Sequence, residues 1–151
     1  MWCAQHDAQT LAPAKARAYE LPSPSGGESA SIALFLMSLP DPDERIKAAV
    51  RGVVAWYERA AVHGVREERV PNKDAAKGYD VVHVADPAAP PVWARFYNLD
   101  TGKPYYCGRD GVKKAALAEI ELERRAGNAG LRPWGAKVLK SYAAWADKHG
   151  K

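Results

Sequence analysis

The chain has 151 residues, of which 47% are hydrophobic and 26% are charged, and its formal net charge is +4. This balance is typical of one globular domain over residues 1–151 and excludes a disordered chain. The longest apolar run, residues 32–37, is far shorter than the roughly 18 residues of a membrane span, so no membrane partner is expected. The first residues show neither the basic flank nor the apolar core of a signal peptide.

Proline and glycine oppose regular structure over residues 1–27, and a first helix is predicted over residues 28–39. Its apolar face is expected to consist of Ile32, Phe35, Leu36 and Leu39. A second helix is predicted from its N-cap, Asp41, to about residue 63, with Pro42 at the first helical position. Its apolar face is expected to consist of Ile46, Ala49, Val50, Val53, Val54 and Tyr57.

The hydrophobic pattern changes in the middle of the chain. Short β-branched and aromatic runs predict strands over residues 65–70, 79–84 and 92–97. A turn over residues 98–104 leads to the aromatic pair that begins at Tyr105, and further helices are predicted over residues 113–125 and 137–148. The chain is therefore expected to be mainly α-helical, with a small β element.

Motifs of familiar enzymes are absent from the sequence. It holds no glycine-rich phosphate loop, no hydrolase motif and no Cys/His spacing of a zinc site. The four scattered histidines are expected to be surface or packing residues; they are His6, His63, His83 and His149. Cys3 and Cys107 are either buried thiols or one disulfide, and we favour buried thiols.

Basic residues are concentrated in the second half of the chain, where residues 95–140 carry ten Lys or Arg against five Asp or Glu. Such a positive field indicates an anionic partner. Arg95 alternates with aromatic residues, Arg109 lies between two glycines, and Arg124 shares a predicted apolar helix face. These arginines either form a site for a planar anion or are ordinary surface and ion-paired residues. No nucleic-acid partner is expected, because they do not follow a basic helix or a known nucleic-acid-binding pattern.

Several segments together resemble the family 10 pectate lyases, from Trp2 to about Arg125. The segments are residues 2–7 (WCAQHD), 16–20 (ARAYE), 35–38 (FLMS), 93–97 (WARFY), 107–114 (CGRDGVKK) and 117–120 (LAEI). The similarity weakens beyond Gly127, where Asn128 stands in place of an aromatic residue of the family. No sugar-stacking role is therefore expected at Asn128.

The resemblance implies part of an α/α toroid that cleaves polygalacturonate by β-elimination, with Ca²⁺ bridging enzyme and substrate carboxylate. It implies that Arg109 is the base that removes the C5 proton, and that Arg95, Arg124 and Arg17 bind substrate carboxylates. An arginine base requires a lowered pKa, because guanidinium is otherwise always protonated. Asp110 opposes this lowering if it pairs with Arg109, and favours it if it instead points away and caps the predicted helix that follows.

The family's calcium-binding aspartates precede the segment that residues 2–7 match, so the chain is expected to be the C-terminal half of a catalytic domain. No metal ligand is predicted within it, because its carboxylates lack the spacing of a calcium loop. The alternative function is a polygalacturonate-binding module without turnover, or an inactive fragment that lacks the calcium-binding half. Uncovered helix faces predict a homo-oligomer or pairing with the missing N-terminal half. Because pectate lyases act outside the cell, the resemblance also implies a secreted protein.

Overall fold

The computed structural model describes residues 1–127 and 130–150, so Asn128 lies outside the described residues. Its helices are α1 (Gly26–Ser38), α2 (Glu44–Ala60), the 3-10 helix η1 (Leu117–Glu119), α3 (Leu122–Arg125) and α4 (Trp134–His149). Its strands are β1 (Val65–Pro71), β2 (Tyr79–Ala85), β3 (Trp93–Ala94), β4 (Phe96–Tyr97), β5 (Pro104–Cys107), β6 (Lys113–Lys114) and β7 (Leu131–Arg132).

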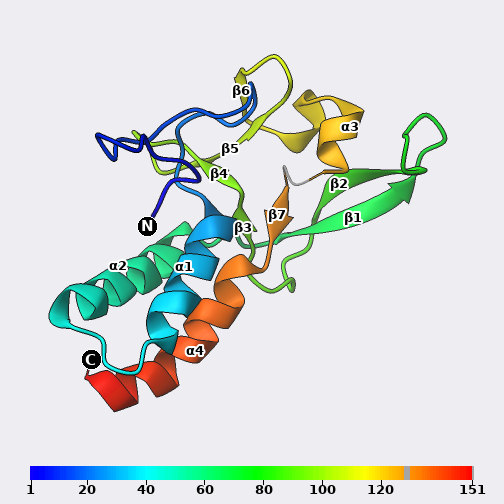
Figure 1. The fold of residues 1–151 in the computed structure, drawn as a ribbon. Helices are drawn as coiled ribbons and strands as arrows, with labels where there is room; N and C mark the ends of the chain where they lie inside the picture. Colours follow the sequence, from blue (N-terminus) through cyan, green and yellow to red (C-terminus); the bar gives the residue numbers. More distant parts are fainter. Residues whose placement is uncertain (128–129, 151) are drawn as a thin grey trace.

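The three long helices and the small sheets lie at opposite ends of the fold (Figure 1). Helices α1, α2 and α4 pack against one another, whereas the sheets, α3 and the N-terminal segment lie beyond the N-terminal ends of α1 and α4. The structure is 36% helix and 22% strand. The expected mainly helical fold, as part of an α/α toroid, is therefore wrong for this chain, because its β-branched and aromatic runs pair as antiparallel strands.

Small residues bring the long helices together. The buried residues of α1 are Gly26, Ser29, Ala30 and Ala33. The predicted apolar face of this helix is wrong at Phe35, whose side chain is 63% exposed. In α4, a Cβ on Gly135 would lie 2.5 Å from the Tyr57 ring and 2.7 Å from the Trp93 ring. The close approach of the helices therefore depends on side chains that are small, a feature that hydrophobic periodicity does not detect.

Helix α2 presents the apolar face that its sequence predicts. Its buried residues are Val50, Val53, Val54 and Tyr57. The predicted N-cap, Asp41, is wrong, because the cap is Asp43, whose Oδ1 accepts a hydrogen bond from the Ile46 N–H at 2.8 Å. Pro42 and Asp43 lie outside the helix, so Asp43 rather than Asp41 supplies the capping carboxylate. The helix therefore begins two residues later than predicted.

The strands form three small sheets. β1 and β2 pair as an antiparallel hairpin in which Val65 lies opposite Ala85, which confirms the first two predicted strands. β4, β5 and β6 form a second sheet, and β3 pairs with β7. The helix predicted over residues 113–125 is wrong, because this segment holds β6, η1 and the short α3. Its apolar residues Leu117 and Ile120 instead pack around β2 and β5.

Cys3 and Cys107 are free and buried, which confirms the prediction of thiols rather than a disulfide. Across the described residues, no helix combines the length and the apolar character needed to cross a bilayer.

Candidate functional site: an arginine cluster around Tyr19

Four arginines from separate parts of the chain meet around the Tyr19 ring. Arg17 lies in the N-terminal segment, Arg95 at the bend between β3 and β4, Arg109 in the turn after β5, and Arg124 in α3. The Cζ atoms of Arg17, Arg109 and Arg124 lie 5.5, 5.1 and 3.7 Å from the centre of the ring. Arg95 joins them, because it lines the same cavity as Tyr19. The structure thus brings together the four arginines that the sequence analysis selected.

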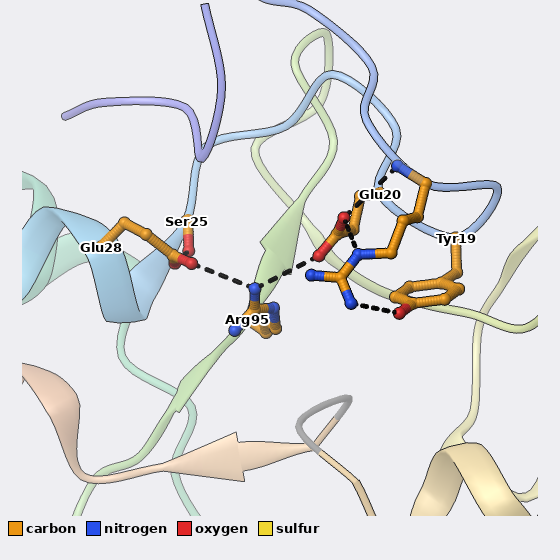
Figure 2. Close-up of polar contacts among 6 residues, drawn as sticks. Tyr19, Glu20, Ser25, Glu28 and Arg95 are labelled. Atoms are coloured by element: carbon orange, nitrogen blue, oxygen red, sulfur yellow. Dashed lines mark hydrogen bonds and ion pairs between the residues drawn. The ribbon is translucent and has the colours of Figure 1, made fainter.

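A buried carboxylate, Glu20, holds two of these arginines. Arg17 Nε donates a hydrogen bond to Glu20 Oε2 at 2.9 Å, and Arg95 Nη2 lies 3.6 Å from Glu20 Oε1. Figure 2 shows Glu20 between Tyr19 and Arg95. Arg17 Nη1 also donates to the Tyr19 hydroxyl at 3.0 Å. The hydrogen bond to Glu20 raises the pKa of Arg17 above its ordinary value.

Arg95 has a second carboxylate partner in the first turn of α1. Its Nη2 donates to Glu28 Oε1 at 3.0 Å, and the Ser25 hydroxyl donates to Glu28 Oε2 (Figure 2). The side chain of Arg95 is only 16% exposed. Glu20 and Glu28 therefore fix the orientation of this guanidinium before any ligand binds.

Arg109 lies at the outer side of the cluster and pairs with Glu123 of α3. Its Nη2 and Nε donate to the two Glu123 oxygens at 2.7 and 3.3 Å. Glu123 raises the pKa of Arg109 above its ordinary value. The backbone N–H of Arg109 donates to Glu121 Oε1 at 2.9 Å, and a Cβ on the preceding Gly108 would lie 2.1 Å from that carboxylate. A side chain at position 108 would therefore displace the Glu121 carboxylate from this hydrogen bond.

Asp110 is directed away from the arginine cluster. Its Oδ1 accepts a hydrogen bond from the Val112 N–H at 3.0 Å, and its Oδ2 lies 3.3 Å from Lys114 Nζ. Of the two alternatives for Asp110, the structure has the one in which this residue caps the following segment, although that segment is a turn and a strand rather than a helix. The carboxylate partner of Arg109 is Glu123 instead.

Arg124 is the buried member of the cluster. Only 7% of the residue is exposed, and its Nε has no hydrogen-bond acceptor among the described residues. Burial lowers the pKa of Arg124, and the nearby charges of Arg109 and Arg95 act in the same direction. A buried cation that lacks an acceptor is costly, and an anion placed against it would remove that cost.

A cavity of about 110 Å³ opens among the cluster residues. It is lined by Arg17, Tyr19, Glu20, Arg95 and Arg124. Three cations face it against one carboxylate, so the cavity favours an anion. Guanidinium groups present paired N–H donors that match a carboxylate, and this geometry suits a uronate group better than a neutral sugar hydroxyl.

Sequence reasoning missed the acidic and aromatic partners of the arginines, namely Tyr19, Glu20, Glu28 and Glu123. The spacing of Glu20, three residues after Arg17, is the one signal that could have indicated a local ion pair. No local pattern links Arg95 to Glu28, which precedes it by 67 residues.

Calcium ligands do not gather within the described residues. Among residues 1–127 and 130–150, no three His, Cys, Asp or Glu side chains are grouped so that they could hold a metal ion. The carboxylates nearest the cluster are already engaged by arginines. The residues present therefore do not fit a calcium site.

Comparisons with known proteins show similarity along nearly the whole chain. The family model for pectic acid lyase matches residues 1–139. A family 10 polysaccharide lyase from Cellvibrio cellulosa has 36% identity and a TM-score of 0.77, over 99% of this chain and 43% of that chain. A mutant of a family 10 polysaccharide lyase from Cellvibrio cellulosa, in complex with trigalacturonic acid, has 35% identity and a TM-score of 0.77, over 99% and 44%. The chain thus spans less than half the length of these lyases, and no curated protein matches it. The chain belongs to the pectic acid lyase family.

Proposed function

We propose that the arginine cluster binds the uronate carboxylates of polygalacturonate and takes part in their cleavage by β-elimination. The observation that carries this proposal is the state of Arg124, a buried cation with an unpartnered Nε beside a cavity that two further arginines line. The trigalacturonic acid bound by the similar lyase supports the same ligand class.

The chemistry of β-elimination suits a cluster of guanidinium groups. A base removes the C5 proton, the electron pair forms the C4–C5 double bond, and the C4–O bond to the neighbouring sugar breaks. Because C5 is adjacent to the C6 carboxylate, negative charge grows on that group as the proton leaves. Fixed cations around the carboxylate stabilise this charge more than that of the ground state. Arg95 is suited to that role, since two carboxylates already fix its orientation.

Arg109 is the proposed base, and Glu123 is the main obstacle to that role. A base must be neutral, whereas the bond to Glu123 raises the pKa of Arg109. Substrate binding would therefore have to separate this pair. Arg17 is the other candidate for the base. It lines the cavity, whereas Arg109 contacts the Tyr19 ring from outside the cavity. Its own carboxylate partner, Glu20, likewise favours the charged form.

The alternative is a polygalacturonate-binding module without turnover. It is favoured by one observation, the absence of a metal-binding group among residues 1–127 and 130–150. The same residues would then bind the carboxylates, and no product would form. The two functions differ only in whether the C4–O bond breaks.

This chain covers 44% of the length of the lyase that binds trigalacturonic acid. This coverage supports the proposal that these residues form one half of a catalytic domain in a secreted lyase. The other half, or a second copy of this chain, would then cover Phe35, which is exposed on α1. Sedimentation velocity measured at increasing concentration tests the second copy. We expect a dimer that Phe35→Ser abolishes, and a strict monomer at high concentration would contradict self-association.

The function is tested by following the ultraviolet absorbance of the unsaturated product from polygalacturonate, with added Ca²⁺ and with chelator. We expect turnover by the wild-type chain and its loss in Arg109→Ala. Binding of the polymer without product would favour the binding module. Turnover that survives Arg109→Ala but is lost in Arg17→Ala would contradict Arg109 as the base and transfer that role to Arg17.

A further inference from the structure

A second hollow adjoins the arginine cluster, between the N-terminal ends of α1 and α4. This α1–α4 groove has a volume of about 590 Å³, and its lining includes Gly27, Glu28, Arg95, Arg132, Trp134 and Lys137. Arg95 lines both the groove and the arginine cavity, so the groove and the cavity lie on either side of its guanidinium group. A volume of this size is in the range of small-ligand sites.

An aromatic side chain forms part of the groove wall. The Trp134 indole packs over the backbone of Gly27, where an added Cβ would lie 3.3 Å from its Cε2 atom. The indole is thus held in place by α1 while it lines the groove. A flat indole offers an apolar surface to the C–H face of a sugar ring and an N–H donor at its edge.

The charges that line the groove leave one cation without a partner. Arg95 is engaged by Glu28, and Arg132 is paired with Glu67. Lys137 is exposed, and no carboxylate lies within ion-pair distance of its Nζ among the described residues. Lys137 is therefore the cation of the groove that is available to pair with a ligand carboxylate.

Two helices begin at this groove. Gly26 at the start of α1 and Trp134 at the start of α4 lie in contact, with a Cβ on Gly26 3.1 Å from the indole. Neither N-cap residue, Ser25 or Pro133, caps its helix with a side-chain hydrogen bond. The positive ends of both helix dipoles lie beside the groove and favour an anion there.

We infer that the α1–α4 groove is an additional uronate subsite, which binds a sugar residue that extends from the arginine cavity. Trp134 supports the sugar ring and Lys137 binds its carboxylate. This inference rests on the proposed function, because the groove shares Arg95 with the cluster. The ligand class is a linear oligogalacturonate rather than a lone anion, since an aromatic wall and a cation lie together in a groove beside a second carboxylate site.

The test compares ligands of two lengths by isothermal titration calorimetry. Trigalacturonate and hexagalacturonate are titrated into the wild-type chain, Lys137→Glu and the matched control Lys140→Glu. The control makes the same charge change one turn further along α4, at an exposed residue that does not line the groove. We expect Lys137→Glu to weaken hexagalacturonate binding about fivefold relative to the control. Trigalacturonate binding should agree between the two variants.

Equal affinities of Lys137→Glu and Lys140→Glu for hexagalacturonate would overturn the subsite. An equal loss for both ligand lengths would also overturn it, because trigalacturonate is expected to occupy the arginine cavity rather than the groove. Trp134→Leu gives an independent arm and should reduce the advantage of the longer ligand while the chain stays folded by circular dichroism. A wild-type chain that binds neither ligand would instead contradict the proposed function itself.

Discussion

The Arg124 guanidinium lies over the face of the Tyr19 ring, with its Cζ atom 3.7 Å from the ring centre. This contact joins α3 to the N-terminal segment, which the chain otherwise separates by about a hundred residues. Because Arg17 and Arg109 also approach this ring, Tyr19 is the centre around which the cluster is built. The ring offsets some of the repulsion among like charges, since its face is negative.

The first prediction separates the ring of Tyr19 from its hydroxyl. Tyr19→Phe keeps the aromatic face and loses only the bond from Arg17, so we expect stability to fall by about 1 kcal/mol or less. Tyr19→Leu removes the face shared by three guanidinium groups and should cost about 2 kcal/mol more. Urea denaturation measures both values. Equal stabilities of the two variants would show that the ring does not support the cluster.

The second prediction concerns the cost of the buried arginine. Arg124→Met replaces a desolvated cation, whose Nε lacks an acceptor, by an apolar chain of similar length. We expect the free energy of unfolding to rise by about 1 kcal/mol, while the affinity for trigalacturonate falls at least about tenfold. Thermal denaturation and calorimetry give the two quantities on one sample. A variant that is less stable and binds as well as the wild type would show that Arg124 is a structural residue.

The third prediction tests the close approach of α4 to α2. An alanine side chain at Gly135 would enter the space held by Tyr57 and Trp93, so Gly135→Ala should destabilise the chain by about 2 kcal/mol. Gly52→Ala is the matched control, because nothing lies within 4 Å of its added Cβ in α2. The control should stabilise the chain by about 1 kcal/mol, as alanine is the better helix former. The same sign of change in both variants would contradict the packing described.

The fourth prediction is a pH dependence of stability. Arg125 donates from Nε and Nη2 to the two oxygens of Asp80 at 2.8 and 2.7 Å, and this holds the pKa of Asp80 below its ordinary value of 3.8. The unfolded chain therefore binds a proton more readily than the folded chain. The stabilisation is present above about pH 4 and is lost as the pH falls through the lower folded pKa.

Asp80→Asn should cost about 3 kcal/mol at neutral pH, because it leaves Arg125 without its anionic partner. It should also flatten the acid limb of the stability curve. Urea denaturation from pH 3 to pH 7 compares the variant with the wild type. A variant whose stability falls with acid as steeply as that of the wild type would show that another group controls this limb.

Local patterns in the sequence predicted the elements that local interactions determine. The short β-branched run from Val65 to Val70, bounded by turn residues, predicted β1, and the apolar periodicity after Asp43 predicted α2. The segment from Lys113 to Arg125 was predicted as one helix and is not, because its first residues pair with β5 and its apolar residues pack on β2, which is distant in the sequence. Tertiary contacts of this kind override helix propensity.

The candidate site was likewise predictable from the sequence only in part. The four arginines could be selected from the sequence, because their aromatic and glycine neighbours match those of a known family. Their carboxylate partners could not, since Glu28 and Arg95 are brought together only by the packing of α1 against β3. Whether an arginine is buried or exposed also depends on the fold, so the difference between Arg124 and Arg109 required the structure.

The most direct test of the cluster as a uronate site is the side-chain nuclear magnetic resonance signal of the Arg124 Nε–H group during a titration with trigalacturonate. This N–H has no acceptor among the described residues, so a bound carboxylate should move its proton signal strongly downfield. The Arg125 signal is the internal control, because Asp80 already accepts from its Nε. A saturable shift at Arg124 with an unchanged Arg125 is the result the account predicts. Binding that leaves the Arg124 signal in place would contradict it.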